Sequence, residues 1–340
     1  MQNLTMMLPE IFLLSMTCIV LLIDLICKSR QKNLIYYLSQ LTLVGTAGIS
    51  IYLFKFPTMI ILNNTFILDP LASFLKILIE VVSIFVFWIS HDYVKNRRMP
   101  LAEFYILSLF AILGMMLLVS SHNLIVLFLG LELSALPVYA LVALWQDSPY
   151  GAEAAMKYFV MGSLASGMLL YGLSMLYGAT GSLNMMPISH SSHDLLLIFG
   201  LVFILAGIAF KFGAAPFHLW VPDVYTGSPT VITLFISAAP KIAAVGMAIR
   251  LLVDTLPSIE PHWQQLLIFV AIASMGLGNF AAIIQTNLKR MFAYSSIAHM
   301  GYLSLGLLAG TNDGYAAALF YMLSYAVMVV GAFGLLVVLS

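Results

Sequence analysis

Long apolar runs separated by short polar stretches are the dominant pattern of the chain. Each run has at least about 18 residues with few charges, which lets one helix cross a bilayer core of ~30 Å. The pattern predicts eleven transmembrane helices, near residues 4–27, 33–54, 66–90, 102–120, 123–145, 155–178, 195–221, 230–253, 265–285, 288–310 and 315–339.

The seventh run carries unusual residues for a membrane span. It is longer than the ~20 residues needed to cross and contains Lys211, with Gly213 and Pro216 close behind. Proline removes a backbone hydrogen bond and clashes with the preceding turn, so we expect a break after Lys211. Broken helices in transporters expose backbone groups and admit water beside a charge at mid-membrane. Trp220 and Tyr225, which follow, are expected to be interface aromatics.

Composition agrees with this pattern. Hydrophobic residues make up 62% of the chain and charged residues 8%, whereas a soluble domain has about 25% charged residues. We therefore expect an all-α polytopic membrane protein. With so few charges there is no basic face for nucleic acid. The first run has no preceding Lys or Arg and no small-residue cleavage site, so a retained helix is expected rather than a signal peptide.

Basic residues set the expected orientation. Most of them fall in the first loop, in the third loop or at the start of the tenth helix, which all lie on one side: Lys28, Arg30, Lys32, Lys95, Arg97, Arg98, Lys289 and Arg290. The other side has Lys55 and Arg250 near helix ends. The positive-inside rule then makes the odd-numbered loops cytoplasmic and the N-terminus external, that is, periplasmic.

Sequence signals for metals and redox groups are weak. Cys18 and Cys27 lie roughly 13 Å apart along one helix, too far for a disulfide, and there is no thiol cluster for an iron–sulfur centre. His190 and His193 have the spacing of a metal pair but lack further ligands. The nucleotide-binding patterns GxGxxG and GxxxxGK[ST] and a nucleophile elbow are also missing. Any redox cofactors are therefore expected outside this chain.

Two ionisable residues in the third run allow two interpretations. A charge at the bilayer centre costs on the order of 3 kcal/mol, so such residues need a reason to be there. Lys76 and Glu80 are four apart on one helix face, so they either neutralise each other or serve a function. The spacing leaves both interpretations open.

Four further charges favour a proton path. We interpret Glu132, Lys157, Lys211 and Lys241 as standing alone on their own helices, so that compensation comes from another helix or from internal water. Burial disfavours the ammonium form of lysine and brings its proton exchange toward neutral pH. A chain of proton-binding sites is favoured over a static network of ion pairs. His218 is either a relay or an interfacial histidine bonded to backbone.

A weak internal repeat supports a transporter. Residues 123–141 can be laid on 287–305, which matches Asn123 with Asn287, and residues 158–172 can be laid on 319–333. An odd number of helices separates the two copies, so they have opposite orientations, as in many secondary transporters. Ser295, Ser296 and His299 form a polar patch where the second copy would need a hydrated path.

Four longer motifs resemble a known family: KFGAAPFHLWVPDVYTGSPT (211–230), APKIAAVG (239–246), FLGLELSALP (128–137) and QTNLKRMFAYSSIAHMGY (285–302). They are similar to the subunit N family of bacterial NADH–quinone oxidoreductase (respiratory complex I), one of its antiporter-like membrane subunits. Relatives in multisubunit Na⁺/H⁺ antiporters share the F-H-x-W-x-P core, and the VPDVY continuation resembles the complex I family rather than those relatives. The resemblance covers nearly the whole chain.

The resemblance implies roles for individual residues. Glu132 and Lys157 resemble the family's helix-five glutamate and helix-six lysine. Lys211 resembles the proton-carrying lysine of the broken seventh helix, Lys241 the connecting lysine on helix eight, and His299 the polar residue on helix ten. NADH, FMN, iron–sulfur clusters and quinone are then expected in partner subunits, with no cofactor in this chain. The implied setting is the bacterial inner membrane, among other membrane subunits of the complex.

The resemblance also divides the chain. It implies an N-terminal three-helix region (1–100), a first antiporter-like five-helix repeat (101–254) and a partial second inverted repeat (262–340). Family members have more helices than the eleven expected here, so the second repeat is expected to be incomplete. Ala318 stands where the first repeat has Lys157. Two alternatives stay open: a subunit of a cation/proton antiporter, and a scaffold that does not conduct.

Overall fold

The structure is a computed structural model that describes residues 2–27, 32–97, 99–145, 148–186 and 194–340. Among these residues, eleven helices have 19 residues or more and coincide with the eleven predicted runs; ten of them are long and apolar enough to cross a membrane. The helices are α1 (Gln2–Thr5), α2 (Leu8–Cys27), α3 (Lys32–Leu53), α4 (Pro70–Asn96), α5 (Leu101–Val119), α6 (Leu124–Val142), α7 (Pro149–Thr180), α8 (Asp194–Phe212), α9 (Trp220–Gly227), α10 (Thr230–Ala248), α11 (Glu260–Ile283), α12 (Leu288–Leu308) and α13 (Asn312–Leu339).

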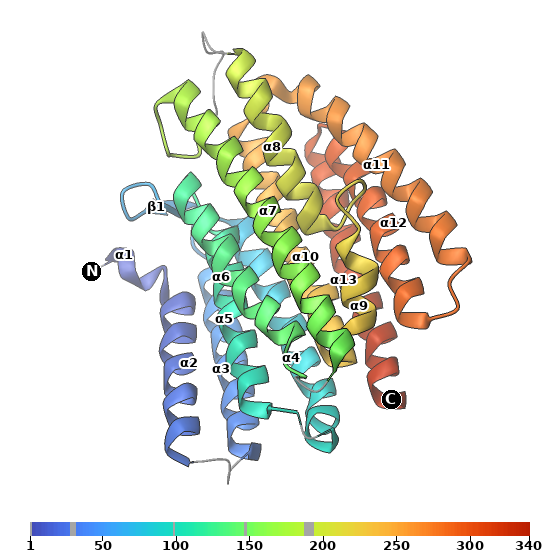
Figure 1. Cartoon of the computed structure of the whole chain (residues 1–340). Helices are drawn as coiled ribbons and strands as arrows, with labels where there is room; N and C mark the ends of the chain where they lie inside the picture. Colours follow the sequence, from blue (N-terminus) through green and yellow to red (C-terminus); the bar gives the residue numbers. More distant parts are fainter. Residues whose placement is uncertain (1, 28–31, 98, 146–147, 187–193) are drawn as a thin grey trace.

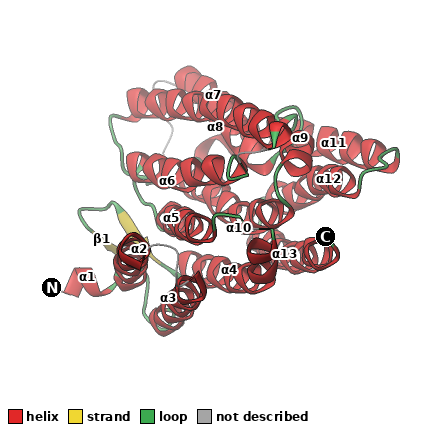
Figure 2. Ribbon diagram, turned by 60° about the horizontal axis from the view of Figure 1, so that its bottom comes forward, coloured by secondary structure: helices red, strands yellow, loops and turns green. Residues whose placement is uncertain are grey.

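Helix α10 lies at the centre of the bundle (Figures 1 and 2). Nearly every residue of α10 is buried, because α4, α5, α6, α8 and α13 all pack against it. Helix α2 packs against α3 and α5 at one edge of the bundle, and α3 packs against α4, whereas α7 and α8 lie side by side at another edge (Figure 2). The buried core of the protein therefore surrounds the helix that carries Lys241.

A small hairpin closes one end of the first three long helices. Strands β1 (Met59–Ile61) and β2 (Phe66–Leu68) connect α3 to α4 and pair antiparallel, with Met59 opposite Leu68. Asp69 then caps α4: its side chain accepts a hydrogen bond from the Ala72 amide, and Pro70 takes the first helical position. Both residue types are favoured at a helix start, because the cap satisfies a free amide and proline has none to satisfy.

The predicted break in the seventh run is confirmed. Helix α8 ends at Phe212 and α9 begins only at Trp220. Gly213 has a left-handed backbone with φ of 64°, and the peptide bond between Ala215 and Pro216 is cis. The chain after α10 also leaves α-helical geometry, through the π-helical turn η1 (Ile249–Thr255) and the short 3₁₀ turn η2 (Pro257–Ile259).

In the helix pairs α5–α6 and α11–α12, the second helix begins in the same way. Asn123 caps α6 by accepting a hydrogen bond from the Ile125 amide, and Asn287 caps α12 by accepting one from the Arg290 amide. These are the two asparagines that the sequence repeat aligns.

The same two pairs also pack alike. Gly114 of α5 lies so close to α6 that an added Cβ would stand 2.3 Å from the Ser134 nitrogen. Gly278 of α11 lies in the same way against α12, where an added Cβ would stand 2.6 Å from the Ala298 nitrogen. One sequence offset relates both glycines, both contact residues and both capping asparagines. The α5–α6 and α11–α12 pairs are thus built on the same plan.

Candidate functional site

The break between α8 and α9 places a lysine against a free backbone carbonyl. In a continuous helix the donor to the Phe212 carbonyl would be the amide of residue 216, but Pro216 has no N–H. The Lys241 ammonium from α10 donates to that carbonyl instead. The C-terminal end of a helix carries partial negative charge, which favours a cation there.

The other freed backbone groups at the break also have partners. The indole N–H of Trp220 donates to the Phe210 carbonyl at 3.1 Å, and the Ala215 amide donates to the Ser274 hydroxyl on α11 at 2.8 Å. A buried peptide group without a hydrogen-bond partner would destabilise the fold, so these bonds stabilise the break inside the bundle. Trp220 and Tyr225 are buried, so the expectation that they are interface aromatics is wrong.

Gly213 is required by space as well as by backbone conformation. A Cβ at this position would stand 2.5 Å from Cγ2 of Val221 and 3.0 Å from the Lys241 ammonium. Any larger residue would therefore push against Val221 and the Lys241 ammonium itself. The sequence pointed to Gly213 and Pro216 as the helix break, and both lie in it.

Lys211 and Lys241 line the same small internal cavity, of ≈ 30 Å³. Ser134 of α6 and Tyr158 of α7 also contribute to its lining. A cavity of this size has room for about one or two water molecules, and the polar groups around it would hold them. The site can therefore keep two ammonium groups and water together within an apolar bundle.

Glu132 lies on α6, near this cavity. It is close enough to act electrostatically on Lys211, and its Oε1 is buried without a hydrogen-bond partner among the described residues. The structure thus brings Lys211 and Lys241 to one cavity, with Glu132 of a third helix within electrostatic range of Lys211. This is the arrangement expected where compensation comes from other helices or from internal water.

Lys157 is placed differently from the other lysines. It is 41% exposed and forms ion pairs at 2.8 Å with both Glu153 and Asp223. The interpretation that Lys157 stands alone on its helix is wrong, because Glu153 lies one helical turn before it. Asp223 lies in α9 and also approaches Arg290 of α12 at 3.6 Å.

His218 belongs to the same region as Lys157. It lines a pocket of ≈ 620 Å³ together with Lys157, Asp223 and Arg290, whereas the cavity of Lys211 does not include it in its lining. Its Nδ1 atom is buried with no hydrogen-bond partner among the described residues. The two lysines Lys157 and Lys211 therefore belong to different hollows, with His218 in the outer one.

His299 lies in a separate polar contact between α12 and α13. Its Nδ1 and the Tyr321 hydroxyl are 2.6 Å apart, and the hydroxyls of Ser296 and Tyr325 are 2.7 Å apart. The predicted polar patch on the tenth long helix is thus present. It does not line the cavity of Lys211 and Lys241.

Lys76 and Glu80 have partners that the sequence interpretation missed. Lys76 forms its ion pair with Glu10 of α2, at 2.5 Å, and not with Glu80. Glu80 accepts a hydrogen bond from Ser50 of α3 at 2.8 Å. The sequence feature that could have predicted this partner is Glu10 itself, an acidic residue in the first turn of an apolar run.

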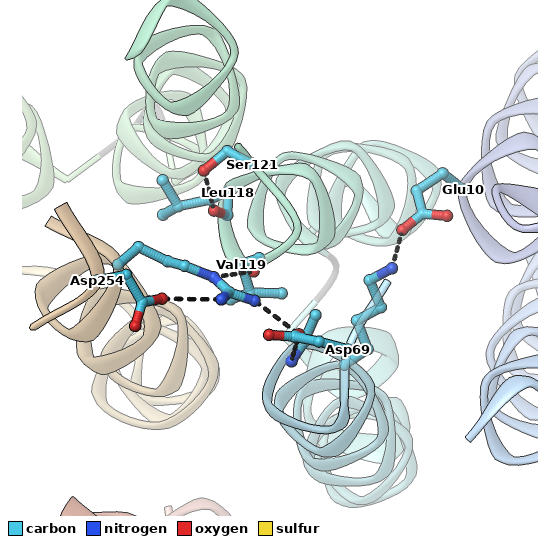
Figure 3. Close-up of polar contacts among 9 residues, drawn as sticks. Glu10, Asp69, Leu118, Val119, Ser121 and Asp254 are labelled. Carbon is cyan, nitrogen blue, oxygen red and sulfur yellow. Dashed lines mark hydrogen bonds and ion pairs between the residues drawn. The ribbon is translucent and has the colours of Figure 1, made fainter. Parts of the chain in front are cut away.

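Arg250 is buried at the end of the bundle near the hairpin. Its guanidinium lies 2.6 Å from Asp69 and 2.9 Å from Asp254, and its Nε donates to the Val119 carbonyl at 3.3 Å (Figure 3). This one side chain therefore ties η1 to the start of α4 and the end of α5. The sequence marked Arg250 only as a charge near a helix end.

Some predicted features lie outside the described residues, namely His190, His193, Lys28, Arg30 and Arg98. Within the part of the chain that the structure describes, no group of three or more His, Cys, Asp or Glu side chains could hold a metal ion. Cys18 is exposed and free.

Comparison with known proteins places these features in a family. Residues 121–340 match the family described as NADH:quinone oxidoreductase/Mrp antiporter, transmembrane. The NADH-quinone oxidoreductase subunit N of Coxiella burnetii is 52% identical over 98% of this chain and 71% of its own length. That of Thioalkalivibrio sulfidiphilus is 48% identical over 98% of this chain and 70% of its own length.

Solved structures show the same fold. A chain of respiratory complex I from Thermus thermophilus, solved with bound aureothin, matches with a TM-score of 0.82 and 32% identity over 96% of this chain and 70% of that chain. A chain of the Mrp complex from Dietzia sp. DQ12-45-1b matches with a TM-score of 0.85 over 97% of this chain and 64% of that chain. Its identity is 18%, so it shares the fold alone.

Proposed function

The chain belongs to the NADH:quinone oxidoreductase/Mrp antiporter transmembrane family and, within it, to the subunit N group, and on that premise we propose that it is a proton-translocating membrane subunit of NADH–quinone oxidoreductase. NADH oxidation and quinone reduction, with FMN and iron–sulfur clusters, take place in partner subunits. This chain contributes the movement of protons across the membrane. The observation that carries the proposal is the shared cavity of Lys211 and Lys241 at the break of the seventh helix.

The path runs from Glu132 to Lys211 and on to Lys241. The two lysines line one cavity, so water held there can contact both of them. An ionised Glu132 stabilises the positive charge on Lys211, and protonation of Glu132 removes that stabilisation. Water in the cavity passes the proton between Lys211 and Lys241. Charge changes driven by the partner subunits would thus move protons stepwise.

The outer pocket is the mouth of this path. Lys157, His218, Asp223 and Arg290 line it, so it is polar enough to be wet. The ion pairs of Lys157 with Glu153 and Asp223 provide carboxylates that exchange protons with solvent. His218 lies in the segment between α8 and α9 and lines this pocket, and serves as the relay. His299, with Tyr321, serves the second repeat in the same way.

The charged ends of the bundle support a proposed orientation. Arg97, Lys289 and Arg290 line one common hollow of ≈ 660 Å³, whereas Arg250 lies beside Asp69 where α4 begins. By the positive-inside rule, the first end faces the cytoplasm and the N-terminus is periplasmic. We place the protein in the bacterial inner membrane, next to other membrane subunits of the complex.

The proposed domain organisation is 1–100 for an N-terminal three-helix region, 101–254 for the first repeat and 262–340 for part of a second, inverted one. The matching asparagine caps and glycine contacts of α5–α6 and α11–α12 support it. The chain spans 70–72% of the length of the curated relatives it matches.

The test compares Lys211→Met with Lys55→Met, a control at an exposed lysine after α3. Inverted membrane vesicles from cells that carry each variant are assayed for NADH-driven acidification, NADH–quinone activity and assembly of the complex. We expect Lys211→Met to lose acidification in an assembled complex, with quinone reduction slowed, while Lys55→Met matches the wild type. Unchanged acidification in the Lys211→Met vesicles would make this chain a scaffold. Sodium-dependent acidification without NADH would make it an antiporter subunit instead.

A further inference from the structure

A second group of buried charges lies outside the proposed path, between α2, α3 and α4. Lys76 of α4 pairs with Glu10 of α2 at 2.5 Å, and Figure 3 shows Glu10 reaching toward α4. One turn further along α4, Glu80 accepts a hydrogen bond from Ser50 of α3 at 2.8 Å. All four side chains are at most 3% exposed. We call these four residues the Lys76 cluster.

The Lys76 cluster does not balance in charge when every group is ionised. It has one ammonium and two carboxylates, and it is fully buried. The second oxygens of Glu10 and Glu80 have no hydrogen-bond partner among the described residues. A buried carboxylate without a cation or donors is strongly disfavoured, and the usual remedy is a proton.

Among the side chains that the structure describes, no other one supplies the missing cation. The charged groups that act on Glu80 are Lys76 and Glu10. Charged residues elsewhere on α4, beside its ends and on the elements packed against it are Asp69, Asp92, Lys95, Glu103, Lys241, Arg250 and Asp313. Two of these cations have other partners: Arg250 is bound to Asp69 and Asp254, and Lys241 to the Phe212 carbonyl.

We propose that the N-terminal three-helix region contains a proton-binding site of its own, in which Glu10 and Glu80 share one proton and Lys76 pairs with whichever carboxylate is ionised. In the observed arrangement Glu10 is the ionised partner and Glu80 carries the proton. Glu80 lies four residues after Lys76 on the same helix face, so the ammonium reaches it by a change of rotamer. In that exchange the Glu80 carboxyl loses a proton and the Glu10 carboxyl gains one, which leaves the net charge at zero.

The surroundings suit a site that exchanges slowly with one side of the membrane. Lys76 lies about 9 Å along α4 from its first residue, and the Phe66 ring of the hairpin lies 4.8 Å from its ammonium. The aromatic face stabilises the cation in the observed position. Leu75, the neighbour of Lys76, meets Gly246 of α10, where an added Cβ would stand 2.8 Å from it. A movement of Lys76 would therefore be transmitted through Leu75 to α10, the helix that carries Lys241.

Infrared difference spectroscopy on the assembled membrane complex at neutral pH tests the proposal through the C=O stretch of protonated carboxyl groups. Spectra are compared between the wild type and Glu80→Gln, Glu10→Gln and Lys76→Met, with Glu103→Gln as a control at an exposed glutamate of α5. Other carboxyl groups cancel in the difference. Glu80→Gln is the key variant because glutamine has the shape of the protonated side chain, and assembly is checked for each.

We expect the Glu80→Gln complex to lose the signal of one protonated carboxyl per chain. Glu10→Gln should lose one as well, because Lys76 then pairs with Glu80 and ionises it. Lys76→Met should gain one, because both glutamates become protonated, and Glu103→Gln should match the wild type. A carboxyl signal unchanged in both Glu80→Gln and Glu10→Gln would overturn the proposal, whatever the outcome for Lys211.

Discussion

Replacing Gly213 by alanine separates two costs of the helix break. The left-handed backbone at φ 64° costs a residue with a Cβ roughly 1–2 kcal/mol. The new methyl group would also stand 2.5 Å from Val221 and 3.0 Å from the Lys241 ammonium, and such crowding costs about 1–3 kcal/mol. We therefore expect Gly213→Ala to lower the free energy of unfolding by about 2–5 kcal/mol.

Two other glycines provide matched controls. Gly181 at the end of α7 has a similar φ of 68°, with nothing within 4 Å of an added Cβ, so Gly181→Ala reports the backbone cost alone. Gly167 inside α7 has neither a positive φ nor a close neighbour, so alanine there should stabilise the helix by roughly 0.5–1 kcal/mol.

The assay is unfolding of the purified chain in mixed micelles with increasing denaturing detergent, followed by helical circular dichroism. The order of stability should be Gly167→Ala, wild type, Gly181→Ala and then Gly213→Ala. In vesicles, Gly213→Ala should also reduce NADH-driven acidification, because its methyl group displaces the Lys241 ammonium. If Gly213→Ala is no less stable than Gly181→Ala, the crowding at the break is not real and the reasoning fails.

Three other changes probe the rest of the structure. Asp69→Ala removes the cap of α4 and the buried partner of Arg250, and should lower the free energy of unfolding by about 3–5 kcal/mol, measured in the same detergent titration. Ser274→Ala leaves the buried Ala215 amide without its acceptor, and should lower it by about 1–3 kcal/mol. Burial, followed by the nearby positive charge of Arg250, lowers the pKa of His122 below its ordinary value of 6.5. The unfolded chain then binds the proton more readily, so stability should fall as the pH drops below about 6.5, and His122→Asn should flatten that dependence.

Each of these changes has a comparison that can contradict it. Asp254 is 42% exposed, so Asp254→Ala should cost less than about 1 kcal/mol; an equal loss would mean that burial is not the cause. Ser174→Ala removes an exposed hydroxyl and should be neutral, unlike Ser274→Ala. Parallel pH curves for wild type and His122→Asn would show that His122 does not titrate as described.

The helices were predictable because membrane spans are local. Length and hydropathy define a span without knowledge of its neighbours, and the break was readable from Gly213 and Pro216. Local spacing also contained the Glu153 partner of Lys157, one turn earlier on the same helix, which the sequence interpretation overlooked.

Contacts between helices were not predictable from the pattern. Glu10 and Lys76 meet because α2 and α4 both pack against α3 and α5, and apolar runs do not predict which helices are neighbours. The acceptor of Lys241 was partly predictable from the sequence, because Pro216 leaves the Phe212 carbonyl without its usual donor. Which lysine would reach that carbonyl depended on α10 lying against α8.

The hydrogen bond between Lys241 and the Phe212 carbonyl restricts where the proton of the lysine can go. A carboxylate partner could take the lysine's proton, but an amide oxygen is far too weak a base to do so. The bond therefore fixes the ammonium without offering an exit, and a departing proton has to leave through the water of the cavity or along another route. Since the acceptor belongs to the backbone, no side-chain substitution at Phe212 removes it. In the proposed path, the position of the Lys241 ammonium thus depends on the course of the main chain rather than on the identity of one side chain.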